Sequence, residues 1–308
     1  MGVTSWGSAP AAVASRRAKV KLTFSEPWRT KISGSGVGTE GKRDLEFARE
    51  LPHAGSMADD NAVERCSRCL EDPKTEEWIH CECVPVPFFG SPNSGKVRIA
   101  TVGINPSSNE FYAYGKLKPQ AQRLAALADY GVSREQLTEG NVADAKVRRE
   151  RYFSGSREPN KWFVNLGKIL SSVNEKLSYA SETAVHLDIA ACVTNDKWSS
   201  VNIAAQTKIV GNCRSHLERT VASLPGETIL FCDGTRVCET LRGKQVLDWR
   251  NLPVDGENKT VEVVQGTFPI AGRLRRFAGW NRPANYLPES ALGAISKWIL
   301  RIYPELGG

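Results

Sequence analysis

The chain lacks several features that would assign it to a common class of protein. It has no run approaching the roughly 18 apolar residues of a membrane helix, and its first residues lack the apolar core of a secretory signal. It contains neither a G-x-G-x-x-G fingerprint nor a P-loop, which argues against a nucleotide-binding α/β enzyme. No internal repeat is present. These absences predict a cytoplasmic protein that does not associate with membranes.

Basic residues exceed acidic ones. The 308 residues include 41 Lys and Arg against 34 Asp and Glu, a formal charge of +7, and the surplus gathers in "SRRAKVK", "KVRRER" and "GRLRRF". This distribution favours a polyanionic partner such as DNA, although a solvated charged surface would give the same composition. With 41% hydrophobic residues, the chain can bury one large core or two small ones, and we expect one main domain and a monomer.

The organisation changes along the chain. Residues 1–60 are rich in Gly, Ser, Ala and charge without a sustained apolar period, which predicts a flexible basic N-terminal arm. Residues 61–308 alternate β-branched runs with helical segments: "VRIATVGI", "PQAQRLAALADYGV", "NKWFVNLGKILSSVNEKL", "AVHLDIAACVT", "CRSHLERTVASL", "ETILFCDG" and "SALGAISKWILRIY". This alternation predicts one three-layer α/β/α domain with a mostly parallel central sheet.

The stretch "VRIATVGINPSSNEF", residues 97–111, reads as a strand that ends in a tight turn. Gly103 permits the turn, Pro106 stiffens it, and Asn105 is presented at the strand tip. Ligands of open parallel sheets bind at the carboxyl ends of the strands, so this loop is a candidate site. An ordinary Asn-Pro turn is the alternative.

"GINPS" resembles the first motif of the uracil-DNA glycosylase superfamily, in the form of its mismatch-specific branch. Further segments follow in that superfamily's order: "RYFSGSREPNKWFVNLGKIL", "HLDIAAC", "CRSHLERTVASLPGETILFCDGTRV" and "GWNRPANYL". The likeness spans about Cys66 to Ile299. It implies a uracil-DNA glycosylase-like fold and a monofunctional DNA glycosylase, which flips a pyrimidine nucleotide out of the duplex and hydrolyses the bond between base and sugar, leaving an abasic site. DNA repair and antiviral defence are both compatible with this activity.

The resemblance assigns catalytic roles to two asparagines. Asn105 matches the residue that holds the attacking water. The histidine that many relatives place in the last motif is absent, and Asn281 or Asn285 stands there instead. A catalytically weak or inactive DNA-binding or sensing module on the same fold is therefore the alternative function. Phe153 matches the family's stacking phenylalanine and Phe111 is a second candidate platform, although both residues are also typical core residues.

The same comparison suggests a base preference. The pocket is expected to include Gly103, Ile104, Pro106 and Ser107, and the small Ser107 stands where relatives place a tyrosine that rejects a C5 methyl group. Asp188 replaces the asparagine that reads uracil. An ionised carboxylate only accepts hydrogen bonds, and cytosine offers an N4 amine donor, so a C5-modified cytosine is favoured over uracil. If Asp188 is protonated or only caps a turn, uracil remains the substrate.

Contacts to DNA are expected from the last motif and the basic segment before it. The last-motif loop, Asn281–Leu287, supplies Arg282, Tyr286 and Leu287 as candidates for a wedge into the minor groove. Arg275 and Arg276 are candidates for phosphate contacts. A solvated basic loop would explain the two arginines equally simply.

Eight cysteines in a reducing compartment suggest a metal site or simple burial rather than disulfides. In the resemblance, Cys66, Cys69, Cys192 and Cys213 occupy the places of the four ligands of a 4Fe-4S iron-sulfur cluster. The alternative is a zinc site closed locally by Cys66, Cys69, Cys81 and Cys83. Cys232 and Cys238 are predicted to be core residues.

Overall fold

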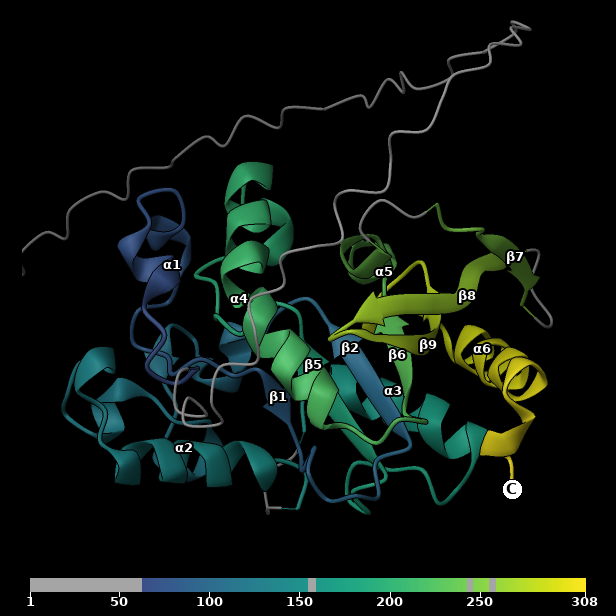
Figure 1. The fold of residues 1–308 in the computed structure, drawn as a ribbon, viewed down its shortest axis with the longest axis horizontal. Coiled ribbons are helices and arrows are strands. Elements are labelled where there is room, and N and C mark those ends of the chain that lie inside the picture. The colour runs from purple at the N-terminus through teal and green to yellow at the C-terminus, as the bar shows by residue number, and fades with distance from the viewer. Residues whose placement is uncertain (1–62, 155–158, 243–245, 255–258) are drawn as a thin grey trace, which may run out of the picture. The chain divides into compact units, whose positions relative to one another are not determined.

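Four parallel strands form the centre of the fold. In the computed structural model, placement is described for residues 63–154, 159–242, 246–254 and 259–308, so the arm predicted over residues 1–60 lies outside the described residues. Strands β2 (Ile99–Gly103), β5 (Ala184–Asp188), β6 (Ile229–Asp233) and β9 (Arg273–Trp280) pair in the order β5-β2-β6-β9, all parallel. This core confirms the predicted mixed α/β class (Figure 1).

Antiparallel strands complete the seven-stranded sheet at both edges. β1 (Phe88–Phe89) pairs with β5, while β8 (Thr260–Ile270) pairs with β9 and β7 (Arg250–Pro253) pairs with β8. A separate two-stranded hairpin consists of β3 (Tyr112–Ala113) and β4 (Lys116–Leu117). The segment "GRLRRF" lies in the long β8–β9 hairpin, most of it in strand β9, rather than in the loop expected from the sequence.

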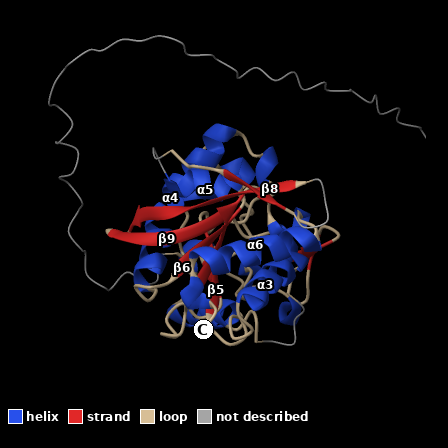
Figure 2. Cartoon of the chain, turned by 90° about the vertical axis from the view of Figure 1, so that its right-hand side faces the viewer, coloured by secondary structure: helices blue, strands red, loops and turns tan. Residues whose placement is uncertain are grey.

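Helices cover both faces of the sheet, because alternate residues of each strand point to opposite sides. Ile99, Phe231 and Ala278 pack with α3 (Lys161–Val173) and α6 (Glu289–Ile302). Ala100, Val102 and Cys232 pack with α4 (Ile203–Ser223) and α5 (Thr235–Arg242). Figure 2 shows α3 and α6 on one side of the strands and α4 and α5 on the other. Two further helices, the short α1 (Arg68–Glu71) and the longer α2 (Glu139–Glu150), precede α3.

Residues 119–132 do not form the helix that the alternation predicts. They contain 3-10 turns at Gln120–Gln122 and Leu127–Asp129. Both guanidinium nitrogens of Arg123 donate to the Asp129 carboxylate, and Leu124, Ala125 and Ala126 are buried in succession. Three consecutive buried residues cannot share one helix face, so tertiary packing overrides helix propensity here.

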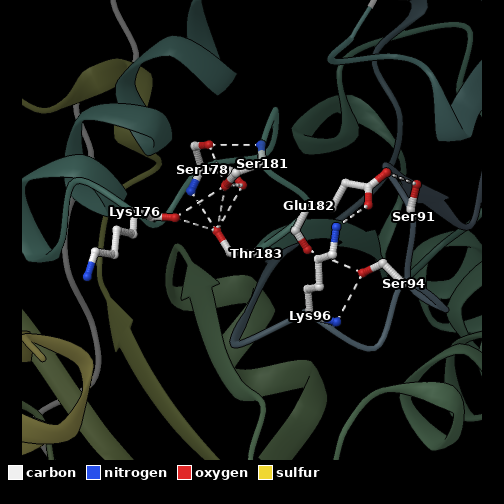
Figure 3. A network of polar contacts seen from close by, with 8 residues as sticks. All are labelled: Ser91, Ser94, Lys96, Lys176, Ser178, Ser181, Glu182 and Thr183. Atoms are coloured by element: carbon white, nitrogen blue, oxygen red, sulfur yellow. Dashed lines mark hydrogen bonds and ion pairs between the residues drawn. The ribbon is translucent and has the colours of Figure 1, made fainter.

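The loops that enter β2 and β5 are tied together at the amino edge of the sheet (Figure 3). Thr183 Oγ1 donates to the Lys176 carbonyl at 2.8 Å and accepts from the Ser178 amide at 2.9 Å. Glu182 bridges to the other loop by accepting from Ser91 Oγ at 3.3 Å and pairing with Lys96. This edge is therefore held by short polar contacts, and the opposite edge carries the long loops.

No helix in the described part of the chain is both long enough and apolar enough to cross a membrane. The described residues all fall within one compact unit, Ser56–Gly308.

Candidate active site and metal centre

The four parallel strands end at one edge of the sheet. Gly103 pairs with Asp188 across β2 and β5, and Asp233 pairs with Trp280 across β6 and β9. The loops that follow these residues contain "INPSS", "IAAC" and "NRPANYL". Three of the segments that carry the sequence resemblance are thus brought to the same carboxyl edge, although they lie far apart in the chain.

Gly103 is required by a close approach of side chains. A Cβ atom at this position would lie 2.8 Å from Trp162 Cη2 and 3.0 Å from both Asp188 Oδ1 and His186 Cε1. The Trp162 indole, from the first turn of α3, also meets the His186 ring edge-on, with 4.6 Å between ring centroids. Glycine therefore allows an indole, an imidazole and a carboxylate to converge on the end of β2.

Asp188 lies inside this group rather than on an open surface. Its Oδ1 lies 3.3 Å from His186 Nε2, while His186 Nδ1 lies 2.8 Å from Thr101 Oγ1. Its Oδ2 is buried and has no hydrogen-bond partner among the described residues. Burial raises the pKa of Asp188 above its ordinary value, and the neighbouring His186 opposes that shift. An unpartnered buried acceptor is costly, so Oδ2 is a group that would gain from a donor.

Asn105 is held from the loop of the neighbouring strand. Its Nδ2 donates to Thr194 Oγ1 at 3.1 Å and to the Pro106 carbonyl at 3.1 Å. Thr194 in turn donates to the Asp196 carbonyl at 2.7 Å. No hydrogen bond from the described residues reaches Asn105 Oδ1, and the residue is half-buried. The amide is therefore fixed through its nitrogen, leaving its oxygen to accept a hydrogen from water.

The other predicted residues of this loop differ in exposure. Ser107 is exposed, and its Oγ accepts from the Asn109 amide at 3.2 Å, capping a 3-10 turn at Ser108–Glu110. Ile104 packs partly against the α4 side of the core, and Pro106 is buried.

Asp233 joins three elements at the same edge. Its Oδ2 accepts from Trp162 Nε1, and its Oδ1 accepts from Trp280 Nε1 at 2.6 Å and from the Ala284 amide at 2.9 Å. Burial raises the pKa of Asp233 to about 7, against the effect of the three donors. Asn165 of α3 donates to the Ala284 carbonyl at 3.0 Å, so the last-motif loop is anchored on both sides of Ala284.

The last-motif loop presents fewer side chains than expected. Asn281 Nδ2 donates to Glu262 Oε2 at 2.7 Å, and its Oδ1 is buried with no partner among the described residues. Arg282 and Asn285 are exposed and Tyr286 is 69% exposed, but Leu287 is buried in the core with α3 and α6. The structure argues against the wedge role predicted for Leu287, because its side chain already packs in the core, whereas Arg282 and Tyr286 remain exposed.

Neither predicted aromatic platform presents a free ring. Phe111 is fully buried in the core. Phe153 is half-buried, and one face of its ring stacks on Tyr179 with 4.2 Å between centroids. Of the two, only Phe153 keeps some exposure.

The structure argues against phosphate contacts by Arg275. Its side chain is 1% exposed and donates to the carbonyls of Val221, Leu224, Pro225 and Gly226, closing the end of α4. Arg276 pairs with Glu305 and lies over the Tyr303 ring. Both arginines belong to the first half of β9, so they lie toward the amino edge, opposite the candidate site. Sequence order alone could not reveal this, because "GRLRRF" precedes the last motif by only a few residues.

Three cysteines that are distant in sequence meet beside the loop after β5. The sulfur atoms of Cys69 in α1, Cys192 and Cys213 in α4 all lie within 4.8 Å of one another, and all three residues are buried. Hydrogen bonds from Cys192 and Cys213 lower the pKa of the Cys69 thiol to about 3, so a thiolate is favoured in this group. Thiolates at this spacing fit an iron-sulfur cluster or zinc.

The remaining cysteines lie outside this group. Among the described residues, Cys66 does not join the three, although the family resemblance implied that it would. The local zinc site would require Cys69 to lie beside Cys81 and Cys83. In the structure Cys69 lies beside Cys192 and Cys213 instead. Arg134 instead binds the segment through its backbone, donating to the carbonyls of Cys66, Cys81 and Cys83. Cys232 and Cys238 are buried core residues, as predicted.

Several residues of the site were not found from the sequence. They are Trp162, His186, Thr194, Asp233 and Trp280. The sequence pattern could have indicated Asp233 as a site residue, because it ends the strand "ILFCD" in the same way that Asp188 ends "AVHLD". His186 and Trp280 lie within strands, where an aromatic residue is ordinarily part of the core.

In comparisons with known proteins, no family model, no curated protein and no solved structure matches this chain.

Proposed function

We propose that this protein is a DNA glycosylase that hydrolyses the bond between a pyrimidine base and deoxyribose, on a uracil-DNA glycosylase-like fold. The observation that carries the proposal is the convergence at one sheet edge of Asn105, Asp188 and the last-motif loop, with Cys69, Cys192 and Cys213 gathered beside them. A short motif alone is weak support for a function, but several motifs that the fold brings to one edge support it more strongly.

The chemistry assigned to Asn105 follows from its hydrogen bonds. With its nitrogen engaged by Thr194 and Pro106, its oxygen accepts one hydrogen of a water molecule and turns the water lone pair toward C1′ of the sugar. The water oxygen forms a bond to C1′ as the C1′–N bond breaks, and the bonding electron pair leaves with the base. A water proton is released as the base takes one up. An amide is a weak base, so this arrangement orients water without strongly activating it.

Asp188 is the proposed reader of the base. Its unpartnered Oδ2 is an acceptor that the N4 amine of cytosine satisfies, and Ser107 leaves room for a C5 substituent. Trp162 covers the end of β2 beside this carboxylate, so entry of a base requires the indole to move. The acceptor-only carboxylate and the small Ser107 together support a C5-modified cytosine rather than uracil as substrate.

The cysteine group supports the fold rather than the reaction. Cys69, Cys192 and Cys213 would hold an iron-sulfur cluster or zinc, whose chemistry here is to cross-link α1, the loop after β5 and α4. Cys192 lies two residues before Thr194, which fixes Asn105, so this cross-link supports the proposed water site.

The test is base release from a panel of DNAs that carry uracil, thymine mismatches, cytosine and C5-substituted cytosines. The wild type should leave alkali-labile abasic sites, and Asn105→Ala should abolish them while DNA binding survives. Asn109→Ala, a change to an exposed asparagine of the same loop as Asn105, is the matched control and should retain activity. Equal release by wild type and Asn105→Ala would remove Asn105 from the mechanism.

A DNA-binding or sensing module is the second candidate. The buried position of Asp188 under Trp162 and the packing of Leu287 into the core favour it. DNA binding by the wild type without release of any base across the panel would select this function.

A further inference from the structure

The β3–β4 hairpin carries an aromatic residue in an unusual backbone conformation. Its two strands are joined by Tyr114 and Gly115, whose φ angles are +53° and +74°. Positive φ at both positions is the requirement of a type I′ turn, which favours Asn-Gly, Asp-Gly or Gly-Gly. A tyrosine in the left-handed region is less favourable than glycine, because its Cβ atom crowds the following carbonyl oxygen.

Nothing in the described protein compensates for this cost. The Tyr114 side chain is 104% exposed, so the ring packs against no neighbour. The β8–β9 hairpin provides an internal comparison, because Ala271 and Gly272 form a turn with φ angles of +52° and +70°. A small residue therefore suffices for this turn. A strained, fully exposed aromatic residue indicates a contact that the isolated chain does not contain.

The hairpin leaves directly from the loop of the proposed water site and is held firmly at its base. Tyr112 donates to Glu82 Oε2 at 2.6 Å and stacks on His80 with 4.4 Å between ring centroids. The Lys118 amide donates to the Phe111 carbonyl at 2.8 Å. At about 3.3 Å per residue, the turn projects roughly 7 Å beyond the Tyr112 anchor before the ring begins. The position of the tip is therefore set by the fold.

Charge identifies the occupant. The hairpin, "YAYGKL", and Lys118 after it contain two lysines and no acidic residue, and Lys116 is exposed beside the tip. Lys118 Nζ already donates to the Asn109 carbonyl at 2.5 Å, so Lys116 is the cation available at the tip. An exposed ring with both faces free, next to that ammonium group, matches the stacking platforms on which nucleobases rest while a cation meets the phosphate. The adjacent loop, which follows β2 and contains Asn105, is the one that we propose contacts the flipped nucleotide.

We propose that Tyr114 stacks on a nucleobase of the bound DNA outside the reaction site, so that the β3–β4 hairpin is a second DNA-contacting element beside the last-motif loop. This inference rests on the proposed function for the identity of the nucleic acid. It assigns to the tyrosine a binding role with no part in the chemical step.

The test uses two substitutions at Tyr114 in the full-length protein, with binding to fluorescein-labelled duplex and single-stranded DNA measured by anisotropy at fixed salt. Tyr114→Gly removes the ring and relieves the turn, so the melting temperature should hold or rise while DNA affinity falls about 5- to 100-fold. Tyr114→Phe keeps the ring and should bind within about twofold of wild type. The matched control is Ala271→Gly, which relieves the same conformation at the opposite edge and should leave affinity unchanged.

Three results would overturn the inference: wild-type affinity in Tyr114→Gly, an equal loss in Tyr114→Phe, which would assign the contact to the hydroxyl group, or an equal loss in Ala271→Gly. The proposed function fails separately. If no base is released from any DNA but the Tyr114 dependence of binding holds, the glycosylase assignment alone is wrong. If base is released and Tyr114→Gly binds like the wild type, the inference alone is wrong.

Discussion

Replacing Asp233 by asparagine should change how the stability of the protein depends on pH. The Asp233 carboxylate is buried, and its pKa is raised from 3.8 to about 7. The native state then holds a proton more tightly than the unfolded chain between these values. The free energy of unfolding therefore falls as pH rises through this range, by at most about 1.4 kcal/mol per pH unit. Asparagine cannot titrate, so Asp233→Asn removes this component.

The magnitude follows from the two pKa values. A group that titrates at about 7 in the native state and 3.8 in the unfolded state contributes about 2 kcal/mol more at pH 5 than at pH 7. The amide also places an N–H group against Trp162 Nε1 or Trp280 Nε1, which costs about 1 to 3 kcal/mol at either pH. The difference in free energy of unfolding between mutant and wild type contains both effects. Only the titration of Asp233 makes that difference change with pH, so measurements at two pH values separate it from the cost of the amide.

Urea unfolding at both pH values, followed by tryptophan fluorescence, measures this quantity. Asp248→Asn changes a carboxylate whose side chain is 81% exposed and should reproduce the wild-type pH dependence. If wild type and Asp233→Asn lose the same free energy of unfolding between pH 5 and pH 7, the carboxylate does not carry the proton assigned to it. The donors from Trp162, Trp280 and Ala284 would then outweigh burial.

The remaining predictions concern the base, the DNA backbone and the metal. Asp188→Asn should shift base release toward uracil and away from cytosine derivatives, as scored by chromatography of the released bases; unchanged selectivity would count against the carboxylate as reader. Arg282→Ala should reduce the slope of log affinity against log salt by about one, while Arg276→Ala, at the opposite edge, should leave the slope unchanged. Equal slopes in the wild type and both variants would show that DNA does not bind at the carboxyl edge. Protein purified anaerobically should be brown and absorb near roughly 400 nm, and Cys213→Ala should lose the metal while Cys238→Ala retains it; a colourless protein with one zinc would select zinc, and metal retained by Cys213→Ala would exclude the group as its site.

The central strands followed from local sequence patterns, whereas most of the cysteine group followed from the family resemblance. "VRIATVGI", "AVHLDIAAC" and "ETILFCDG" each contain a central strand, because short apolar runs flanked by turn residues determine buried strands locally. Cys69, Cys192 and Cys213 met as the resemblance implied, whereas Cys66 did not join them. Two cysteines on one turn need not point to the same place, so the spacing alone could not decide this.

Side-chain burial at the site was less accessible to sequence reasoning. The basic run around Arg275 predicts a surface cation, yet four carbonyl oxygens at the end of α4 hold it inside. The last motif predicts a wedge at Leu287, yet this side chain packs in the core. Both outcomes depend on contacts between segments distant in the chain, which no local pattern encodes.

The cysteine group also has a consequence for synthesis of the chain on the ribosome. Cys69 lies in the first described helix, whereas Cys213 lies in α4, after two of the four central strands have been made. The Cys69 thiol therefore cannot contact Cys213 until α4 has left the ribosome, and it lacks this buried environment until then. A loop of this length closes slowly and at an entropic cost. Folding intermediates of this protein should accordingly be more sensitive to thiol oxidation than the finished molecule.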